Sequence, residues 1–450
     1  MDFTLDEEVI MHIDRKLLSL ILILFVLSLS GCTPSTSAVK IKSGKELNFF
    51  VSTDVHYLAE SITDKGEAYQ KFIKSSDGRQ LNYISEIVDA FTNDIKKKEA
   101  DVLIISGDLT TNGEKKSHLE LAKKLKKIEA SGTSVFVIPG NHDILNPFAR
   151  GFEGGNQYIV DYINGKEFKK IYKEFGYDEA VSRDTNTLSY LAAPSEDLWL
   201  LMLDTALYKD NLIKNKPRLD GEINSGTFEW IKKCSDLAKK NNAQIIAVMH
   251  HNLIDHSESI KNGYTINNST EVLQLFEDCG IKLVLSGHTH QQDIKSYSKG
   301  EYKVYDVVTS ALVVYPQRYG ILKYSPKDGF NYSTTSVDVE SWSKEQDLKD
   351  KNLINFKVYS EEYYKTSQYN NTIQRFLMDD SLTSEEAKLM AETSALIRAK
   401  YLGGTLKLNK QEIINSQGYK LLTKSGAQKS LIRMLNGDDT DNNRLQVPVQ

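Results

Sequence analysis

The stretch "VIPGNHDIL", residues 137–145, joins an apolar run to three adjacent polar side chains. Residues 134–138 predict a buried strand, and Pro139 and Gly140 end it, because proline and glycine interrupt regular structure. Asn141, His142 and Asp143 follow immediately. A polar turn that closes a strand would explain this tripeptide by itself, so the ends of the other strands have to show whether it belongs to a site.

Polar clusters follow four other strand-like runs of the chain. They are Asp54 with His56 after 47–53, Gly107-Asp108 after 101–106, His250-His251 after 244–249, and His288 with His290 after 282–286. In an open α/β sheet, the loops at the carboxyl ends of the strands converge on one crevice. These clusters are far apart in the sequence, and we expect them to be neighbours in space.

The pattern of apolar residues predicts a layered α/β fold. Strand-like runs alternate with helical patterns at 81–98, 115–130 and 270–280, which implies that the first strands are parallel. Strand-like runs without intervening helices at 302–308, 319–325 and 332–339 predict an antiparallel portion. The polar stretch 146–195, with one helix near 166–175, reads as an insertion over the sheet that could carry specificity.

The residue types of the clusters suit divalent transition metals. Imidazoles, carboxylates and one amide oxygen, without a thiolate, are ligands for manganese, iron or zinc. In an extended chain, residues two apart point the same way, so Asp54 with His56, and His288 with His290, can each reach one site. Seven candidate ligands exceed what one metal with an open position can use, so the set predicts two metal ions.

The motifs D-x-H, G-D, G-N-H-D, a histidine at a strand end and G-H-T-H, in this order, resemble the calcineurin-like metallophosphoesterases over residues 47–340. The residues that make up these motifs are most similar to those of the cyclic nucleotide phosphodiesterase branch of the family. The resemblance implies an α/β (α+β, four-layer) fold, a β-sandwich flanked by helices, with a dinuclear centre. It assigns residues as follows: Asp54, His56 and His290 to the first metal; Asn141, His250 and His288 to the second; Asp108 to both; and His142 to protonating the leaving oxygen.

Two cations held this way can bridge a hydroxide that attacks the phosphoryl group. Asn141 would add a ligand without negative charge, and Asp143 is predicted to orient a histidine, as carboxylates do around metal sites. We expect His251 to be an outer or substrate-facing group. His118 is expected to be solvated on a charged helix, and Asp204 to form a structural turn or an outer contact.

The N-terminus predicts export. The apolar run Leu17–Leu29 follows Arg15-Lys16 and ends in "LSGC", which resembles a bacterial lipoprotein signal with Cys32 as the lipidated residue. Residues 1–31 would be the signal peptide and 32–45 a tether, and the acidic residues 1–10 suggest that translation starts at Met11. An ordinary cleaved signal or a membrane anchor is the alternative. The expected location is the extracytoplasmic face of the bacterial membrane.

Composition excludes some partners. The chain has 450 residues, 40% of them hydrophobic, and a formal net charge of −5, so it can bury a core but offers no basic field for long nucleic acids. Apart from Cys32, only Cys234 and Cys279 occur, and two buried thiols are favoured over a disulfide.

Residues 46–342 are therefore predicted to be a metallophosphoesterase catalytic domain, and 343–450 a helical region that ends in a polar tail. The aromatic stretch 356–371 within it is expected to be a packing face. The predicted function is phosphodiester hydrolysis, with cyclic nucleotides as substrates and two manganese or iron ions, or zinc, as cofactors. Alternatives are a broad phosphoesterase for extracytoplasmic nucleotides or envelope phosphodiesters, and a surface binding lipoprotein with a structural metal site. Oligomeric state, the native metals and the role of 343–450 stay open.

Overall fold

The structure, a computed structural model, describes residues 41–257, 261–426, 428–435 and 441–448. The predicted signal peptide, the start at Met11, Cys32 and most of the tether lie outside the described residues. None of the helices in these ranges is both long enough and apolar enough to cross a membrane.

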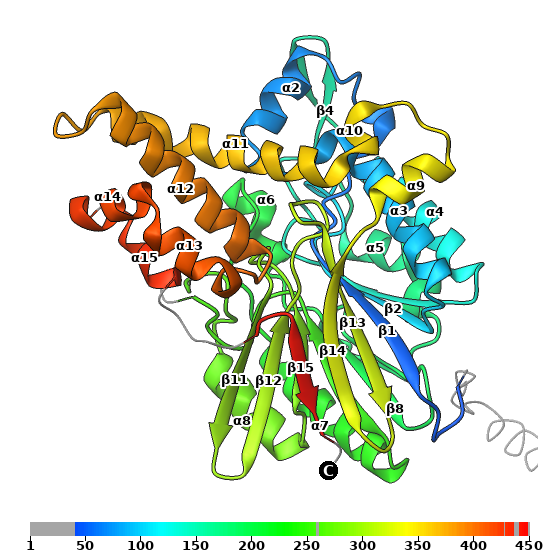
Figure 1. Cartoon of the computed structure of the whole chain (residues 1–450). Helices are drawn as coiled ribbons and strands as arrows, with labels where there is room; N and C mark the ends of the chain where they lie inside the picture. Colours follow the sequence, from blue (N-terminus) through cyan, green and yellow to red (C-terminus); the bar gives the residue numbers. More distant parts are fainter. Residues whose placement is uncertain (1–40, 258–260, 427, 436–440, 449–450) are drawn as a thin grey trace, which may run out of the picture. The chain divides into compact units, whose positions relative to one another are not determined.

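Six strands form the first sheet (Figure 1). In spatial order they are β15 (Arg444–Val447), β14 (Gly329–Ser336), β13 (Arg318–Ser325), β1 (Leu47–Ser52), β2 (Val102–Ser106) and β3 (Ser134–Ile138). β1, β2 and β3 are parallel, as predicted, whereas β13, β14 and β15 are antiparallel to their neighbours. The predicted antiparallel portion thus adds strands to the sheet that carries β1.

Seven strands form the second sheet. Their order is β11 (Asp293–Lys299), β12 (Tyr302–Val308), β10 (Leu283–Ser286), β9 (Gln244–Met249), β8 (Leu198–Leu203), β7 (Tyr190–Ala192) and β6 (Ser182–Arg183). The central strands β8, β9, β10 and β12 are parallel, which places the loops after β9 and β10 at the same end of the sheet.

Strand β8 shows how the sheets are layered. Successive side chains of a strand point to opposite faces. Leu200 and Met202 belong to the core that also contains β1, β2 and β3, whereas Leu201 and Leu203 lie in a second core under α7 (Ser225–Lys240) and α8 (Ser269–Cys279). The predicted sandwich flanked by helices is confirmed. Cys234 and Cys279 are buried in this second core and unpaired, as expected.

Helices α2 (Glu67–Lys74), α3 (Ile84–Lys97) and α4 (Lys115–Glu129) join the first three strands. Residues 146–195 contain more structure than the one predicted helix. They form the hairpin β4 (Arg150–Glu153) and β5 (Asn156–Ile159), helix α5 (Gly165–Ile171), a π-helical turn at Lys173–Tyr177, and the short strands β6 and β7. Strands of two and three residues are too short to show a periodicity in the sequence. A short helix, α6 (Asn211–Lys214), follows β8.

The predicted helical region follows β14 and has its own apolar core. Its helices are α9 (Val339–Glu345), α10 (Lys351–Ile354), α11 (Phe356–Leu377), α12 (Ser384–Leu402), α13 (Lys410–Asn415), α14 (Gln417–Ser425) and α15 (Lys429–Leu435). The expected polar tail is different in the structure, because Arg444–Val447 pairs with β14 as an edge strand. Leu353, Phe356 and Tyr364 also join the core of the sheets, so the aromatic stretch is a packing face, as expected.

A buried charged contact joins the loop after β9 to the edge of the second sheet. His256 Nδ1 lies 2.8 Å from Asp293 Oδ2, and its Nε2 lies 3.2 Å from Asp306 Oδ2. Asp306 also accepts the backbone N–H of Leu253 and of Ile254. Burial opposes the charge of His256, but the two carboxylates outweigh it and raise the pKa of His256 to about 9.

We expect this contact to make stability depend on pH. Because the folded pKa lies above the unfolded value of 6.5, the stabilisation is complete below pH 6.5 and is lost as pH rises to about 9. The full effect corresponds to about 3 kcal/mol of unfolding free energy. Urea unfolding of the wild type and His256→Gln at constant metal content should show this loss in the wild type alone. Parallel pH curves for the two proteins would contradict it.

Candidate metal centre

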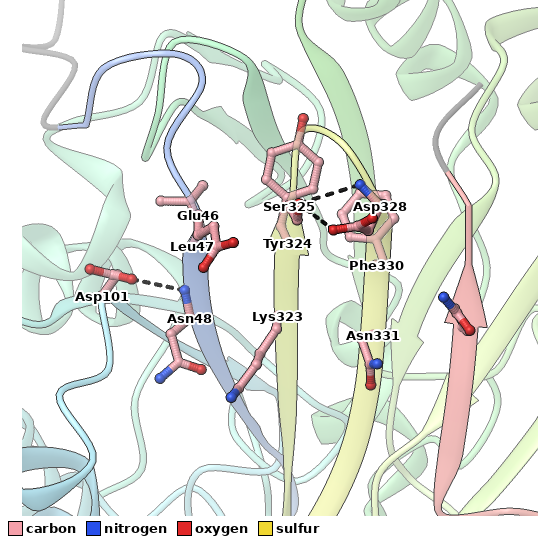
Figure 2. Close-up of a pocket in the computed structure, with 12 residues that line it drawn as sticks. Glu46, Leu47, Asn48, Asp101, Lys323, Tyr324, Ser325, Asp328, Phe330 and Asn331 are labelled. Atoms are coloured by element: carbon pink, nitrogen blue, oxygen red, sulfur yellow. Dashed lines mark hydrogen bonds between the residues drawn. The ribbon is translucent and has the colours of Figure 1, made fainter.

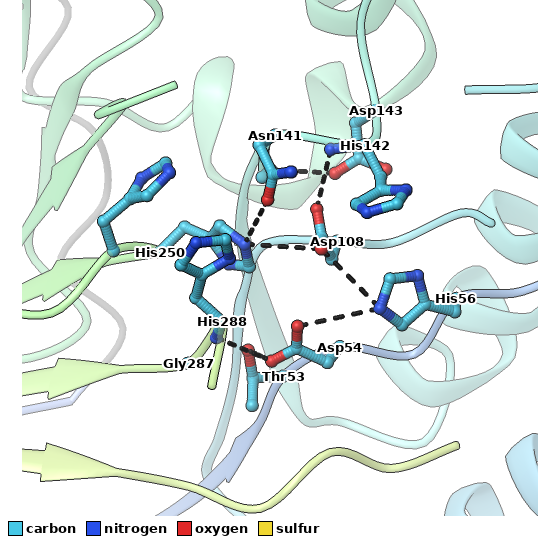
Figure 3. Close-up of polar contacts among 12 residues, drawn as sticks. Thr53, Asp54, His56, Asp108, Asn141, His142, Asp143, His250, Gly287 and His288 are labelled. Carbon is cyan, nitrogen blue, oxygen red and sulfur yellow. Dashed lines mark hydrogen bonds and ion pairs between the residues drawn. The ribbon is translucent and has the colours of Figure 1, made fainter. Parts of the chain in front are cut away.

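The loops that follow β1, β2, β3, β9 and β10 meet at one place (Figure 3). Backbone hydrogen bonds join them: Asp54 N–H donates to Gly107 O at 3.0 Å, and His56 N–H donates to Asp108 O at 2.9 Å. Gly287 N–H donates to His250 O at 3.0 Å. All eight side chains predicted for the metal and catalytic roles lie on these loops.

Five of these residues have a left-handed backbone. Their φ values are 50° at Asp54, 44° at His56, 49° at Asp108, 70° at His288 and 59° at His290. Residues other than glycine rarely adopt positive φ, and such positions cost about 1–3 kcal/mol each and concentrate at functional sites. The surrounding fold holds these residues in an unfavourable conformation that turns their side chains toward one another.

Three motif glycines allow the loops to approach closely. A Cβ on Gly107 would lie 2.6 Å from His250 Nδ1, and one on Gly140 would lie 2.3 Å from Asp108 Oδ1. A Cβ on Gly287 would lie 2.0 Å from Thr53 Oγ1. The glycines of the G-D, G-N-H-D and G-H-T-H motifs therefore leave the space that the acidic and histidine side chains need.

Asp54, His56 and His290 form the first cluster. Asp54 Oδ1 lies 3.2 Å from His290 Nε2 and 3.7 Å from His56 Nε2, and the two histidine nitrogens are 3.1 Å apart. The other oxygen, Asp54 Oδ2, accepts hydrogen bonds from Thr53 Oγ1 and from the N–H of His288. One oxygen is therefore fixed by the protein, and the other faces the cluster.

Asp108, His250 and His288 form the second cluster. His250 Nδ1 lies 2.9 Å from Ser106 O, and His288 Nε2 lies 2.9 Å from Gly263 O. A carbonyl oxygen can only accept, so these nitrogens carry the hydrogen and the opposite nitrogen of each ring faces the cluster. Asn141 Oδ1 lies 3.1 Å from His250 Nε2 and adds an uncharged oxygen.

Asp108 lies between the two clusters. Its Oδ2 is 3.6 Å from His56 Nε2 in the first cluster and 3.4 Å from His250 Nε2 in the second. Its Oδ1 accepts the backbone N–H of His142 at 2.9 Å. The Asp108 carboxylate is therefore placed where it could be a ligand of two cations at once.

The donor set fits two divalent cations. Asp54 Oδ1 is buried without a hydrogen-bond donor, which is costly unless a positive charge is near. Burial lowers the pKa of His56 well below its ordinary value and that of His288 to about 4, so both rings are neutral and offer lone pairs. Burial opposes a charge on His250, but Asp108 raises its pKa to about 9, so that without metal a proton supplies the missing positive charge. Imidazole and carboxylate ligands suit manganese, iron or zinc alike.

His142 stands apart from both clusters. Its Nδ1 lies 2.8 Å from Thr111 O and 3.2 Å from Asn112 Oδ1, so the Nδ1 hydrogen is donated to the loop after β2. Its ring meets that of His56 edge to face, with 5.0 Å between centroids. The ring is thus fixed beside the first cluster, and Nε2 is left for another partner.

Asp143 does not orient a histidine as expected. Its carboxylate accepts the backbone N–H groups of Leu109 at 3.1 Å, Thr110 at 2.9 Å and Gly140 at 2.8 Å. It therefore fastens the loop after β2 to the loop after β3. Burial raises the pKa of Asp143 to about 7, with the charge of Asp108 acting in the same direction.

The prediction that His118 is solvated is wrong. Its side chain is buried, with Nε2 at 2.9 Å from Asp143 O and Nδ1 at 2.9 Å from Tyr172 Oη. His118 lies on the same face of α4 as Leu121, Leu125 and Ile128, at helical spacing, and this periodicity is the signal that could have revealed its burial.

His251 and Asp204 lie outside the clusters. His251 is buried; its Nδ1 lies 2.8 Å from Thr205 Oγ1, its Nε2 faces Leu219 O, and its ring packs on His288. It is an outer group rather than a substrate-facing one. Asp204 accepts hydrogen bonds from Tyr208, Leu188 and Ala206 and so stabilises a turn.

Two residues near the clusters were not identified from the sequence. Tyr264 packs its ring on His288, with centroids 4.9 Å apart, and Arg79 lies near enough for its charge to act on His56 and His142. Both occur in polar, glycine-containing segments, "SDGRQ" and "KNGYT", that read as ordinary turns.

A pocket of about 350 Å³ lies at the other end of β1 (Figure 2). It is lined by Leu47, where β1 begins, and by residues of β13 and β14 such as Lys323 and Phe330. No histidine lines it, whereas Asp54 follows the opposite end of β1. The pocket is therefore separate from the metal centre.

Two curated relatives of the chain are named as probable cyclic nucleotide phosphodiesterases. A probable cyclic nucleotide phosphodiesterase of Coxiella burnetii is 26% identical over 204 residues, which are 44% of this chain and 63% of that protein. One of Psychrobacter arcticus is 24% identical over 221 residues, 48% of this chain and 66% of that protein. The matched part thus covers just under two thirds of the length of these relatives.

Solved structures are more distant. A dimetal phosphatase from Danio rerio covers 64% of this chain and 95% of its own at 11% identity, with a TM-score of 0.44. A purple acid phosphatase from yellow lupin (Lupinus luteus) seeds covers 65% and 52% at 12% identity, with a TM-score of 0.39.

Two family models match the chain in succession. The model described as the C-terminal domain of cyclic nucleotide phosphodiesterase matches residues 338–442, which include the helices α9 to α15. The model described as calcineurin-like phosphoesterase matches residues 47–292, more than half of the chain, and this range contains every residue of the two clusters. The resemblance inferred from the motifs is confirmed, and the chain belongs to the calcineurin-like phosphoesterase family.

Proposed function

We propose that the protein is a metal-dependent phosphodiesterase that hydrolyses cyclic nucleotides. The observation that carries this proposal is the pair of His/Asp clusters, with Asp108 of the second cluster also facing the first, and with His142 fixed beside them but outside both. The names of the relatives and the match of residues 338–442 support the cyclic nucleotide branch.

The chain's residues would hold two cations in separate sets. Asp54, His56 and His290 would hold one, and Asn141, His250 and His288 the other, with Asp108 shared. Two divalent ions, when bound, polarise the phosphoryl oxygens and supply a nucleophile from water at neutral pH. The chain keeps the ligand atoms in place through Ser106 O, Gly263 O and the N–H of His288.

His142 would hold and deliver the proton that the leaving oxygen needs. Because its Nδ1–H is donated to Thr111 O, the second proton can reside only on Nε2. A general acid so placed contributes about 10²- to 10⁴-fold to a rate. A purely structural metal site would not need this histidine, which favours an enzyme over a binding lipoprotein with a structural metal.

The proposed location is the extracytoplasmic face of a bacterial membrane, with a lipid on Cys32. It rests on the apolar run Leu17–Leu29 and the sequence "LSGC", both in the undescribed part of the chain. In such a location, nucleotides outside the cell or phosphodiesters of the envelope are alternative substrates.

The activity test uses manganese-loaded protein beginning after Cys32. We expect an aryl phosphodiester and at least one cyclic nucleotide to be cleaved faster than an aryl phosphomonoester. His142→Ala should lower kcat by about 10²- to 10⁴-fold at unchanged metal content, measured by elemental analysis. As a control, Asn112→Ala should change kcat far less, because it leaves the bond to Thr111 O intact. Equal losses of metal and of activity in His142→Ala would refute its proposed role.

Metal binding should depend on Asp108 more than on any other single ligand. We expect calorimetry to show two manganese ions per wild-type chain, and Asp108→Asn to weaken both by at least roughly 100-fold, because even outer contacts contribute up to that much. Binding should also weaken at lower pH, since His250 must release its proton. The exposed Asp161→Asn should bind as the wild type does. Loss of only one ion in Asp108→Asn would show that this carboxylate is not shared.

Lipidation is tested in cells that express the full chain. Labelled palmitate should be incorporated into the wild type, and Cys32→Ser should abolish the label and release the protein from the membrane fraction. A labelled Cys32→Ser protein would exclude Cys32 as the anchor.

A further inference from the structure

The loop that follows β10 carries His288 and His290 and ends at Gln292, directly before β11. Gln292 is buried, with 1% of its surface exposed. A carboxamide has donors and acceptors that need partners when it leaves water. Gln292 is also the last residue of the range that the calcineurin-like phosphoesterase model matches. Its contacts therefore show what lies behind the loop that carries two metal ligands.

Gln292 contacts the C-terminal region at two points. Its backbone N–H donates to Leu402 O at 2.8 Å, and its Nε2 donates to Asn442 O at 2.8 Å. Leu402 is the last residue of α12, and the final carbonyl groups of a helix have no partner within the helix. The loop thus supplies a donor that the helix end lacks. Both acceptors belong to the range that matches the C-terminal domain of cyclic nucleotide phosphodiesterase.

The same side chain is connected to the backbone of His290. Gln292 Oε1 accepts the N–H of Ser310 at 3.4 Å and the hydroxyl of Tyr332 at 3.3 Å. Ser310 Oγ in turn donates to His290 O at 3.3 Å, and Ala311 N–H donates to the same oxygen at 3.3 Å. Gln292 therefore joins the C-terminal region to the residues that fix the carbonyl of a metal ligand.

The end of α12 packs closely against Gln292. A Cβ on Gly404 would lie 2.9 Å from Gln292 Cγ and 3.0 Å from Gln292 O. Gly404 O accepts Asn443 Nδ2 at 2.8 Å, and Asn443 Oδ1 accepts the hydroxyl of Thr334, on β14, at 2.6 Å. The end of α12 is thus fixed to the first sheet as well as to the loop, so it can support the loop from behind.

His290 needs such support more than the other two residues of its cluster. Its φ of 59° is a conformation that a residue other than glycine keeps only when the surrounding structure imposes it. Its side chain is 21% exposed, whereas those of Asp54 and His56 are fully buried. Packing therefore restrains His290 less than its partners, and the hydrogen bonds behind it have to hold it in place.

We propose that Gln292 is a positioning residue for the first cation, and that through it the C-terminal region is a working part of the metal centre. This inference rests on the proposed function, which assigns Asp54, His56 and His290 to one cation. It adds that affinity for this cation depends on the end of α12 and on the segment at Asn442, both far beyond the last ligand in the sequence. Groups that orient a ligand contribute about 10- to 100-fold to metal affinity.

The test measures metal binding by calorimetry, without turnover. Manganese is titrated into the metal-free full chain of the wild type, Gln292→Met and Gly404→Ala. Gln292→Met keeps the length of the side chain but removes its hydrogen bonds, and Gly404→Ala pushes the end of α12 against an unaltered Gln292. Both variants should weaken one of the two manganese ions about 10- to 100-fold and leave the other within about threefold of the wild type.

Each variant has a matched control. Gln317 is also a buried glutamine that contacts the C-terminal region, since its Oε1 accepts the hydroxyl of Ser360, on α11, at 2.9 Å. Gly426, at the end of α14, has a φ of 65°, close to the 64° of Gly404. Gln317→Met and Gly426→Ala make the same chemical changes in contacts that do not include Gln292, so both should bind two ions as the wild type does. The unfolding midpoint is measured for every variant.

A double variant identifies the ion that is weakened. His290→Ala should weaken the first ion by itself, and adding Gln292→Met should then have no further effect on the ion that remains, because a positioning residue acts only through the ligand that it positions. A further loss in the double variant would overturn the proposal, and so would equal weakening of both ions in Gln292→Met or binding like that of the wild type. If Gln292→Met does not fold, Gly404→Ala and its control decide. A Gly404→Ala protein that binds both ions as the wild type does would overturn the part assigned to the C-terminal region.

The same proteins separate this proposal from the proposed function. If the wild type binds two ions, and Gln292→Met loses one of them, but no phosphodiester is cleaved, the positioning role stands and the assigned reaction fails. If the wild type cleaves phosphodiesters and Gln292→Met keeps both ions, the reaction stands and the positioning role fails. A wild type that binds fewer than two ions would refute the shared assignment of ligands, and with it both proposals.

Discussion

Two carboxylates, Asp54 and Asp108, are buried at the place where five strand ends meet, and the rest of the site follows from that fact. A buried carboxylate is unfavourable unless a cation or hydrogen-bond donors neutralise it. Here one oxygen of each is held by backbone N–H groups or a hydroxyl, and the other faces imidazoles: His56 and His290 for Asp54, and His56 and His250 for Asp108. The left-handed backbone at five ligand positions and the motif glycines keep these oxygens turned inward.

Much of this could be predicted from the sequence, because the information is local. An apolar run followed directly by polar residues marks each strand end, with a glycine between them at Gly107, Gly140 and Gly287, and parallel strands bring such ends together. Asp54, Asp108, Asn141 and His250 could therefore be grouped before their positions were known. The assignment of His250 over His251 to the cluster followed from nearness to the strand end, and the structure groups the same residue.

The residues that sequence reasoning misplaced make their contacts to the main chain or across distant segments. Asp143 binds backbone N–H groups, which any residue could supply, so nothing in the sequence names its partners. Arg79, which the sequence analysis did not single out, is paired through its backbone with Val314, more than two hundred residues away, and β15 pairs with β14 across the whole helical region. His118 is different, because its helical spacing to the apolar residues of α4 could have predicted its burial. The many charged residues of this helix led instead to the prediction that it is solvated.

The order of strands in the first sheet constrains how the chain can fold. β1, near residue 50, has β13, near residue 320, as one of its two neighbours, and the first metal-ligating residue, Asp54, directly follows β1. Pairings between such distant segments form slowly because a long loop must close first. Until the segment that forms β13 is in place, β1 has only its parallel partner β2, and Asp54 and His56 lack His290 until a segment more than two hundred residues later joins them. Assembly of the metal centre therefore requires most of the catalytic domain to be available to the folding chain.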